Sequence, residues 1–151
     1  MAQDVQSCPR VPTFTAVYSR NHAECGCLGT QIVEAVGFGA LRGLLGRDGL
    51  DVGEGMYFPS TPCGALHSIA MRFEFDALYL DRAGRVRRVL HCVQPGRLCV
   101  WDFRTVAALE LPAGVARDVR IGDVVHLQPT ELDASGGLGN AVVRRSMSTP
   151  V

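Results

Sequence analysis

The chain has 151 residues, enough for one domain with a hydrophobic core, and 47% of them are hydrophobic while 20% are charged. Fifteen basic residues, all arginine, balance fifteen acidic ones, so we expect no nucleic-acid partner and no membrane partner. No apolar stretch reaches the roughly 18 residues of a membrane span, and the N-terminus lacks a signal-peptide pattern, so we expect a cytoplasmic protein with free thiols.

The first third of the chain predicts two strands and a short helix. Residues 1–12 form a loose lead-in, and residues 13–18 are rich in β-forming side chains and predict a strand. Residues 19–26 are turn-like, and residues 28–36 predict a second strand. The glycine-rich stretch GFGALRGLLG, residues 37–46, places apolar side chains at helical spacing. We therefore expect a short helix here that depends on packing, because glycine destabilises a helix by about 1 kcal/mol relative to alanine.

The rest of the chain predicts further strands. The clearest is FEFDALYL, residues 73–80, where Phe73, Phe75, Ala77 and Tyr79 share one face. The turn Asp81–Gly84 joins it to a partner strand, because aspartate opens turns and glycine adopts positive φ. Other predicted elements are strands at 56–58, 85–93, 105–111 and 124–128 and one helical turn through 112–119.

Seven or so short strands, one short helix and one helical turn predict a mainly β fold: a small, largely antiparallel β-sandwich or barrel-like domain. We expect this single domain to span residues 13–128. Residues 129–151 are rich in serine, glycine and proline without periodicity, and predict a disordered tail.

Four motifs follow one another along the chain. They are LRGLLGR at 41–47, HSIAMRFEFD at 67–76, LDRAGRV at 80–86, and LELPAG at 109–114 followed by IGD at 121–123. In this order and spacing they resemble the bacterial and archaeal family called Domain of Unknown Function family 192, over about residues 18–128. The resemblance implies a compact β fold with short helices and no established activity.

Cys63, His67 and Met71 fall four residues apart, and these side chains suit a soft metal. Blue-copper sites use a second histidine, which His22 could supply. A strand would spread the three over about 13 Å, so they converge only on a loop or a helical turn. Otherwise Met71 packs as core and Cys63 as a small apolar group. We expect no cofactor, with copper or zinc at these four residues as the alternative.

The second motif also predicts a ligand pocket. Asp76 enters an apolar part of its strand, and a carboxylate there requires a partner. It either fixes strand register through a structural hydrogen bond or ion pair, or forms the polar floor of a pocket. The candidate ligand-binding residues are His67, Arg72, Asp76 and Arg97. We interpret the arginines of residues 82–88 as a solvated surface.

The expected function is a non-catalytic accessory module that binds a small ligand or a protein. No nucleophile with a partnered base stands out, so we assign no catalytic residue and leave enzymatic activity open. A metal-binding or redox protein using Cys63, His67 and Met71 is the alternative, and a hydrolase is the least favoured one.

Overall fold

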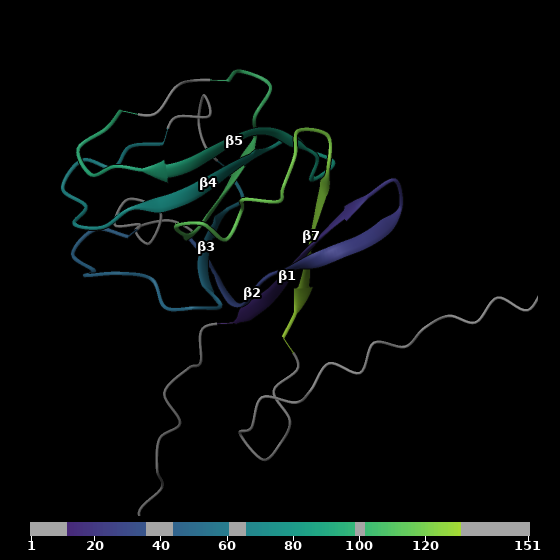
Figure 1. Cartoon of the computed structure of the whole chain (residues 1–151), viewed down its shortest axis with the longest axis horizontal. Helices are drawn as coiled ribbons and strands as arrows, with labels where there is room; N and C mark the ends of the chain where they lie inside the picture. The colour runs from purple at the N-terminus through teal and green to yellow at the C-terminus, as the bar shows by residue number, and fades with distance from the viewer. Residues whose placement is uncertain (1–11, 36–43, 61–65, 99–101, 131–151) are drawn as a thin grey trace, which may run out of the picture.

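The structure is a computed structural model that describes residues 12–35, 44–60, 66–98 and 102–130. Seven strands form one sheet in the order β5-β4-β6-β3-β2-β1-β7 (Figure 1). Their bounds are β1 Thr13–Arg20, β2 Ala23–Glu34, β3 Glu54–Phe58, β4 Phe75–Leu80, β5 Val86–Val93, β6 Ala107–Pro112 and β7 Val124–Pro129. Strands β2 and β3 are parallel, and the other neighbouring strands are antiparallel.

The predicted mainly β, largely antiparallel fold is confirmed. Among the described residues the edge strands β5 and β7 do not pair along their lengths; the bridge between Arg85 and Val124 and a few backbone hydrogen bonds join only their starts. The sheet is therefore not closed into a barrel and is compatible with a sandwich-like domain. No helix in the described ranges is long and apolar enough to cross a membrane.

Two local predictions differ from the structure. Most of residues 19–26 are strand rather than turn, because β1 and β2 are joined by only Asn21 and His22. Both have positive φ, 50° and 66°, as in the two-residue turns whose twist matches that of the strands. Residues 113–118 form successive turns rather than a helical turn. The predicted helix at 37–46 lies mostly outside the described residues, as do residues 1–11 and 131–151.

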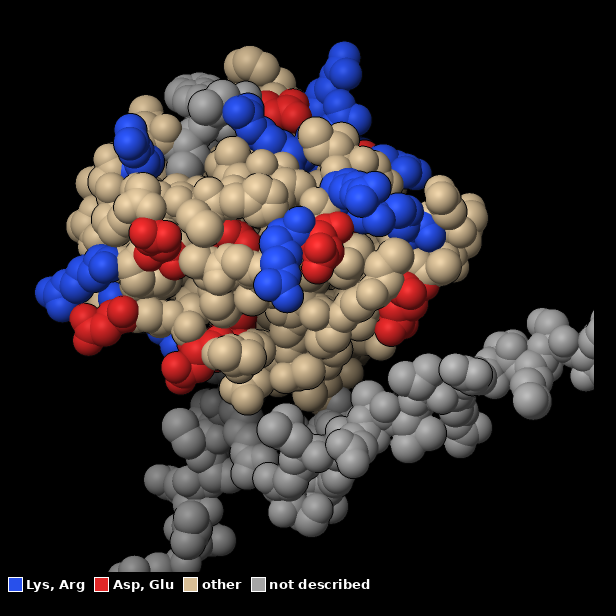
Figure 2. Space-filling model, in the orientation of Figure 1, with Lys and Arg blue, Asp and Glu red and all other residues tan. Residues whose placement is uncertain are grey.

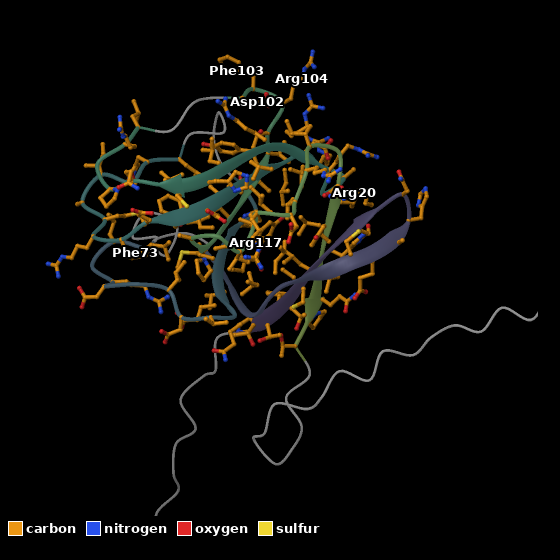
Figure 3. All side chains as sticks on the ribbon, viewed as in Figure 1. Arg20, Phe73, Asp102, Phe103, Arg104 and Arg117 are labelled. Carbon is orange, nitrogen blue, oxygen red and sulfur yellow. The ribbon has the colours of Figure 1, made fainter. Side chains whose placement is uncertain are left out.

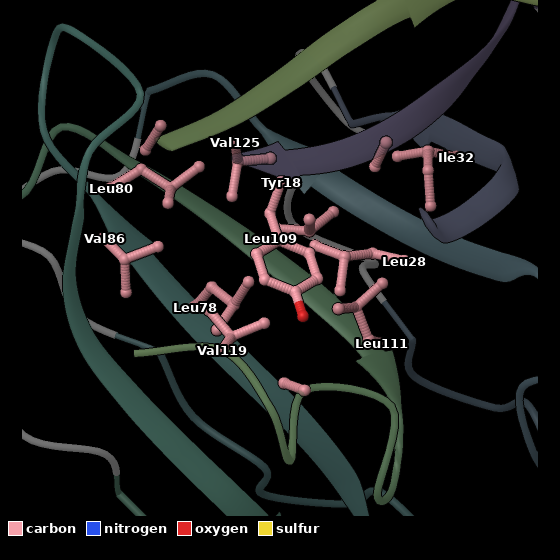
Figure 4. Packing of buried hydrophobic residues seen from close by; sticks show 13 residues of the cluster. Tyr18, Leu28, Ile32, Leu78, Leu80, Val86, Leu109, Leu111, Val119 and Val125 are labelled. Carbon is pink, nitrogen blue, oxygen red and sulfur yellow. The ribbon is translucent and has the colours of Figure 1, made fainter. Parts of the chain in front are cut away.

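The main core lies on one face of the curved sheet (Figure 4). It joins distant strands, because Tyr18 of β1 packs in the same cluster as Leu78 of β4 and Leu109 of β6. The other members are Ala16, Leu28, Ile32, Leu80, Val86, Ala107, Leu111, Ala116, Val119 and Val125. Burial of these apolar side chains from all seven strands except β3 provides the driving force that curls the sheet.

A second core covers the opposite face of the central strands. It contains Phe75, Ala77 and Tyr79 of β4 together with Phe58 of β3 and Met71. Phe75, Ala77 and Tyr79 therefore share one face as predicted, while Leu78 and Leu80 face the main core. Strand β4 is buried on both sides, which explains its nearly continuous run of apolar residues.

Asp76 is the exception in β4, and its side chain is fully buried. The backbone N–H of Cys92 donates to its Oδ1 and that of Ala116 to its Oδ2, each at 2.9 Å. Cys92 has φ 48° and lies where the pairing of β4 with β5 shifts register. The carboxylate thus holds a bulge of β5 and the β6–β7 loop against β4. This is the structural hydrogen bond that the sequence left as one of two alternatives.

Glu110 of β6 is a second buried carboxyl, 3% exposed. It lies opposite Ala77 on one neighbouring strand and Met56 on the other, which places it on the face of the second core. No hydrogen bond from a described residue reaches its carboxyl, and burial raises the pKa of Glu110 from 4.5 to about 8. The folded state therefore holds this side chain as a neutral acid at pH 7.

Replacement of Asp76 by asparagine should lower the free energy of unfolding by about 1–3 kcal/mol, because one backbone N–H would face an amide NH2 instead of an acceptor. Asp48→Asn is the control, since Asp48 forms a solvent-exposed pair with Arg72 and should change stability by less than about 0.5 kcal/mol. Urea denaturation measures both, and equal effects would contradict the structural role of Asp76.

The pKa of Glu110 makes stability depend on pH. A raised carboxyl pKa means that the folded protein holds a proton that the unfolded chain releases above pH 4.5, so stability falls as pH rises from 4.5 to about 8. The contribution of this group is about 1.4 kcal/mol per pH unit. Glu110→Gln should remove that slope in urea denaturation between pH 5 and pH 7.5. Parallel pH profiles for the two proteins would show that Glu110 does not titrate in this way.

Candidate anion-binding groove

The structure brings together two of the four predicted ligand-binding residues. His67 and Arg97 lie on paired segments, because His67 bridges to Leu98 and the backbone of Ser68 bonds to the carbonyl of Arg97 at 2.8 Å. Arg72 instead contacts the exposed Asp48 at 3.1 Å. The carboxylate of Asp76 is enclosed and holds two backbone groups. A pocket built from all four residues stays a prediction.

The four candidate metal ligands lie in different settings. Met71 is buried in the second core, His67 is exposed, and His22 is in the turn between β1 and β2. Cys63 lies outside the described residues. Over the described ranges no group of three His, Cys, Asp or Glu side chains could hold a metal ion. The expectation of no cofactor stays a prediction.

A groove of about 870 Å³ lies elsewhere, beside the start of β7. Its floor includes two pairs across β1 and β7, Val17 with His126 and Ser19 with Val124, on the face away from the main core. Its walls are the β1–β2 turn and residues 120–123. Arg20, Arg85 and Arg120 all line it, although they come from three separate parts of the chain.

Arg20 is anchored by a buried carboxylate. Its Nε and Nη2 atoms donate to Oδ1 and Oδ2 of Asp123, each at 2.8 Å, and Nη2 also donates to the carbonyl of Asp118 at 3.0 Å. The hydrogen bond from Arg20 lowers the pKa of Asp123, so the carboxylate is charged at neutral pH. This bidentate pair fixes the guanidinium plane between β7 and the β1–β2 hairpin (Figure 3).

The other two arginines extend from tight turns next to this pair. The Nη1 of Arg85 donates to the carbonyl of Gly122 at 3.0 Å, and the backbone N–H of Arg120 donates to Asp123 Oδ2 at 2.8 Å. Gly84 allows the close approach, because a Cβ atom there would lie 2.7 Å from the Val125 carbonyl. Both arginine side chains are exposed. The guanidinium of Arg85 donates one hydrogen bond, and that of Arg120 donates none to a described residue, so most of their N–H donors are available to a ligand.

Two histidines complete the groove. The Oγ of Ser19 and Nε2 of His126 are 2.9 Å apart, while His22 projects from the turn with φ 66°. Guanidinium forks match the oxygens of carboxylate and phosphate groups, and imidazole and hydroxyl groups add further hydrogen bonds. Figure 2 shows basic and acidic side chains interspersed over the visible face, so the excess of positive charge is local to the groove lining. The side chains of this lining suit binding of an oxyanion.

Sequence reasoning missed this groove. The sequence predicts a solvated surface for Arg85, and no motif contains Arg20 or Arg120. The available signal was that each arginine adjoins a turn, in the stretches SRNH, AGR and RIGD. Only the pairing of β1 with β7 and the bridge between Arg85 and Val124 bring those turns together.

Replacement of His22 by glycine should raise the free energy of unfolding by about 0.5–1 kcal/mol. Glycine adopts the left-handed conformation of this position without steric strain, which stabilises the folded state by about 1–2 kcal/mol. The greater freedom of glycine in the unfolded chain offsets about half of that gain. Ala70→Gly is the matched control, because Ala70 has φ 65° outside the groove and should gain similarly. Thermal and urea unfolding measure both, and a loss of stability in the His22 variant alone would contradict the assignment of strain.

Comparison with known proteins agrees with this fold. A crystal structure of a protein of unknown function from Novosphingobium aromaticivorans DSM 12444 is 19% identical, with TM-score 0.63 over 74% of this chain and 83% of that one. Another, from Sinorhizobium meliloti 1021 and called a "putative transcription regulator", is 20% identical, with TM-score 0.64 over 76% and 92%. At these identities the likeness shows the fold alone, and no curated protein matches significantly. The family described as "Uncharacterized ACR" matches residues 37–127, more than half of the chain, which therefore belongs to Domain of Unknown Function family 192.

Proposed function

We propose that the protein is a non-catalytic binding module that holds a small ligand by an oxyanion, either a carboxylate or a phosphate group. One observation supports this above all: Arg20, Arg85 and Arg120 line a single groove. Arg20 and Arg85 are held by protein acceptors, so little of their side-chain freedom is lost when a ligand binds.

The local charge favours an anion although the whole chain is neutral. Asp123 and Arg20 neutralise one another as an ion pair. Of the other charged lining residues, Arg85 and Arg120 are basic and Glu24 is acidic, which leaves the groove with net positive charge. Charge-assisted hydrogen bonds from two guanidinium groups are about twice as strong as neutral ones.

A small ligand fits this groove better than nucleic acid. Surfaces that bind single strands carry large aromatic side chains on which bases stack, and no Phe, Tyr or Trp is among the described residues that line the groove. One structural neighbour is named for transcription, but a likeness at 20% identity does not identify a nucleic-acid partner for this chain. We therefore propose a small organic or inorganic anion as the ligand and no nucleic-acid or membrane partner.

A hydrolase is the second candidate, because Ser19 and His126 form a hydroxyl–imidazole contact of 2.9 Å in the groove. A catalytic base of this type needs a third group that orients its other ring nitrogen. Within the described part of the chain no such group bonds to His126, which is exposed. We rank binding first for this reason.

We also propose a cytoplasmic location. Cys25, Cys27 and Cys92, which lie within the described residues, are free thiols. Free exposed thiols persist in reducing compartments, and they are oxidised readily outside them.

Calorimetric titration with inorganic phosphate and with acetate at low ionic strength tests the proposal. Arg85→Gln and Arg120→Gln should each weaken binding of these anions about tenfold, since each removes a charged donor worth about 1.5 kcal/mol or more. Arg20 is unsuitable for the test, because its loss would leave Asp123 buried and unpaired.

Arg104→Gln is the control, because Arg104 is exposed on a separate loop beside Asp102 and Phe103 (Figure 3). It should bind both anions like the wild type. Equal weakening in all three variants would reveal only nonspecific charge attraction. Absence of binding to the wild type at millimolar phosphate and acetate would refute the proposed function.

A further inference from the structure

The groove is too large for a simple oxyanion. Its volume of about 870 Å³ lies in the range of sites for small organic molecules, which is about 300–1,000 Å³. A phosphate or carboxylate group held by Arg85 and Arg120 would occupy only part of that space. The groove therefore has room for a larger ligand, which would contact the remaining lining.

That remaining lining is partly apolar. Val17 and Val124 contribute to the floor, and Ile121 lies between Arg120 and Gly122 in the groove wall. The Ile121 side chain is 70% exposed, although isoleucine is usually buried in folded proteins. A bound apolar group would remove it from water and strengthen binding in proportion to the area covered.

Polar side chains that could orient such a ligand surround these residues. Asn21 and Gln128 line the groove together with His126. Small-molecule sites combine apolar walls with a few polar groups that fix orientation, and this groove adds a cationic end to that combination.

We propose that the natural ligand is an amphiphilic organic anion: a carboxylate or phosphate monoester that carries a short alkyl or aryl group. Its oxyanion binds Arg85 and Arg120, and its apolar group covers Ile121 and Val124. This inference rests on the proposed function, since it requires the arginines to hold the charged end.

Titration calorimetry with matched pairs of ligands tests it. Phenyl phosphate should bind the wild type about tenfold more tightly than inorganic phosphate, and hexanoate about tenfold more tightly than acetate. Tighter binding of the two phosphates would identify phosphate as the preferred head group, and tighter binding of hexanoate and acetate would identify carboxylate. Ile121→Ser should abolish the gain from the apolar group, so that phenyl phosphate and inorganic phosphate bind this variant with about equal affinity.

Ile69→Ser is the matched control, because Ile69 is also an exposed isoleucine, 54% accessible, and is not among the groove lining. It should retain the full gain. If the apolar group adds nothing in the wild type while phosphate and acetate still bind, this inference fails and the proposed function stands. If Ile121→Ser keeps the gain, the apolar group binds elsewhere and the inference is overturned. If none of the four anions binds, the proposed function itself is refuted.

Discussion

The buried carboxylate of Asp123 is the group on which both the sheet corner and the groove depend. The carboxylate accepts two hydrogen bonds from Arg20 and one from the backbone N–H of Arg120. The backbone carbonyl of Asp123 accepts a hydrogen bond from the N–H of Val86 at 2.7 Å. One residue therefore holds the end of β1, the loop before β7 and the start of β5 together. A buried carboxylate offsets its loss of hydration only with such complete bonding. The geometry that completes the sheet also sets the positions of the groove arginines.

Much of the fold could be predicted because its signals are local. Alternation of apolar and polar residues and β-branched side chains indicated the strands, and the burial of β4 on both faces matches its run of apolar residues. The length of the β1–β2 hairpin was underestimated, since Asn21 and His22 adopt a tight turn for which histidine is an uncommon choice. The order of the sheet could not be predicted, because β6 lies between β3 and β4 and β7 pairs with β1 through contacts far apart in sequence.

The candidate site also divides into what local sequence signals predict and what only contacts between distant residues reveal. The need of Asp76 for a partner followed from its apolar setting, but its partners are the backbone groups of Cys92 and Ala116, which no side-chain pattern specifies. The polar residues of the second motif, HSIAMRFEFD, thus include one with a structural role. The groove arginines lie as much as 100 positions apart, from Arg20 to Arg120, so only the three-dimensional pairing reveals them.

The location of anion binding is the central claim, and amide chemical-shift mapping measures it most directly. Addition of inorganic phosphate to the uniformly ¹⁵N-labelled chain should shift the resonances of residues 19–24, 84–86 and 120–126, with little change elsewhere. These segments meet only in the folded groove, so coincident saturation of their shifts would indicate one shared site. Shifts centred on His67 and Arg97 would place binding outside the groove and contradict the account.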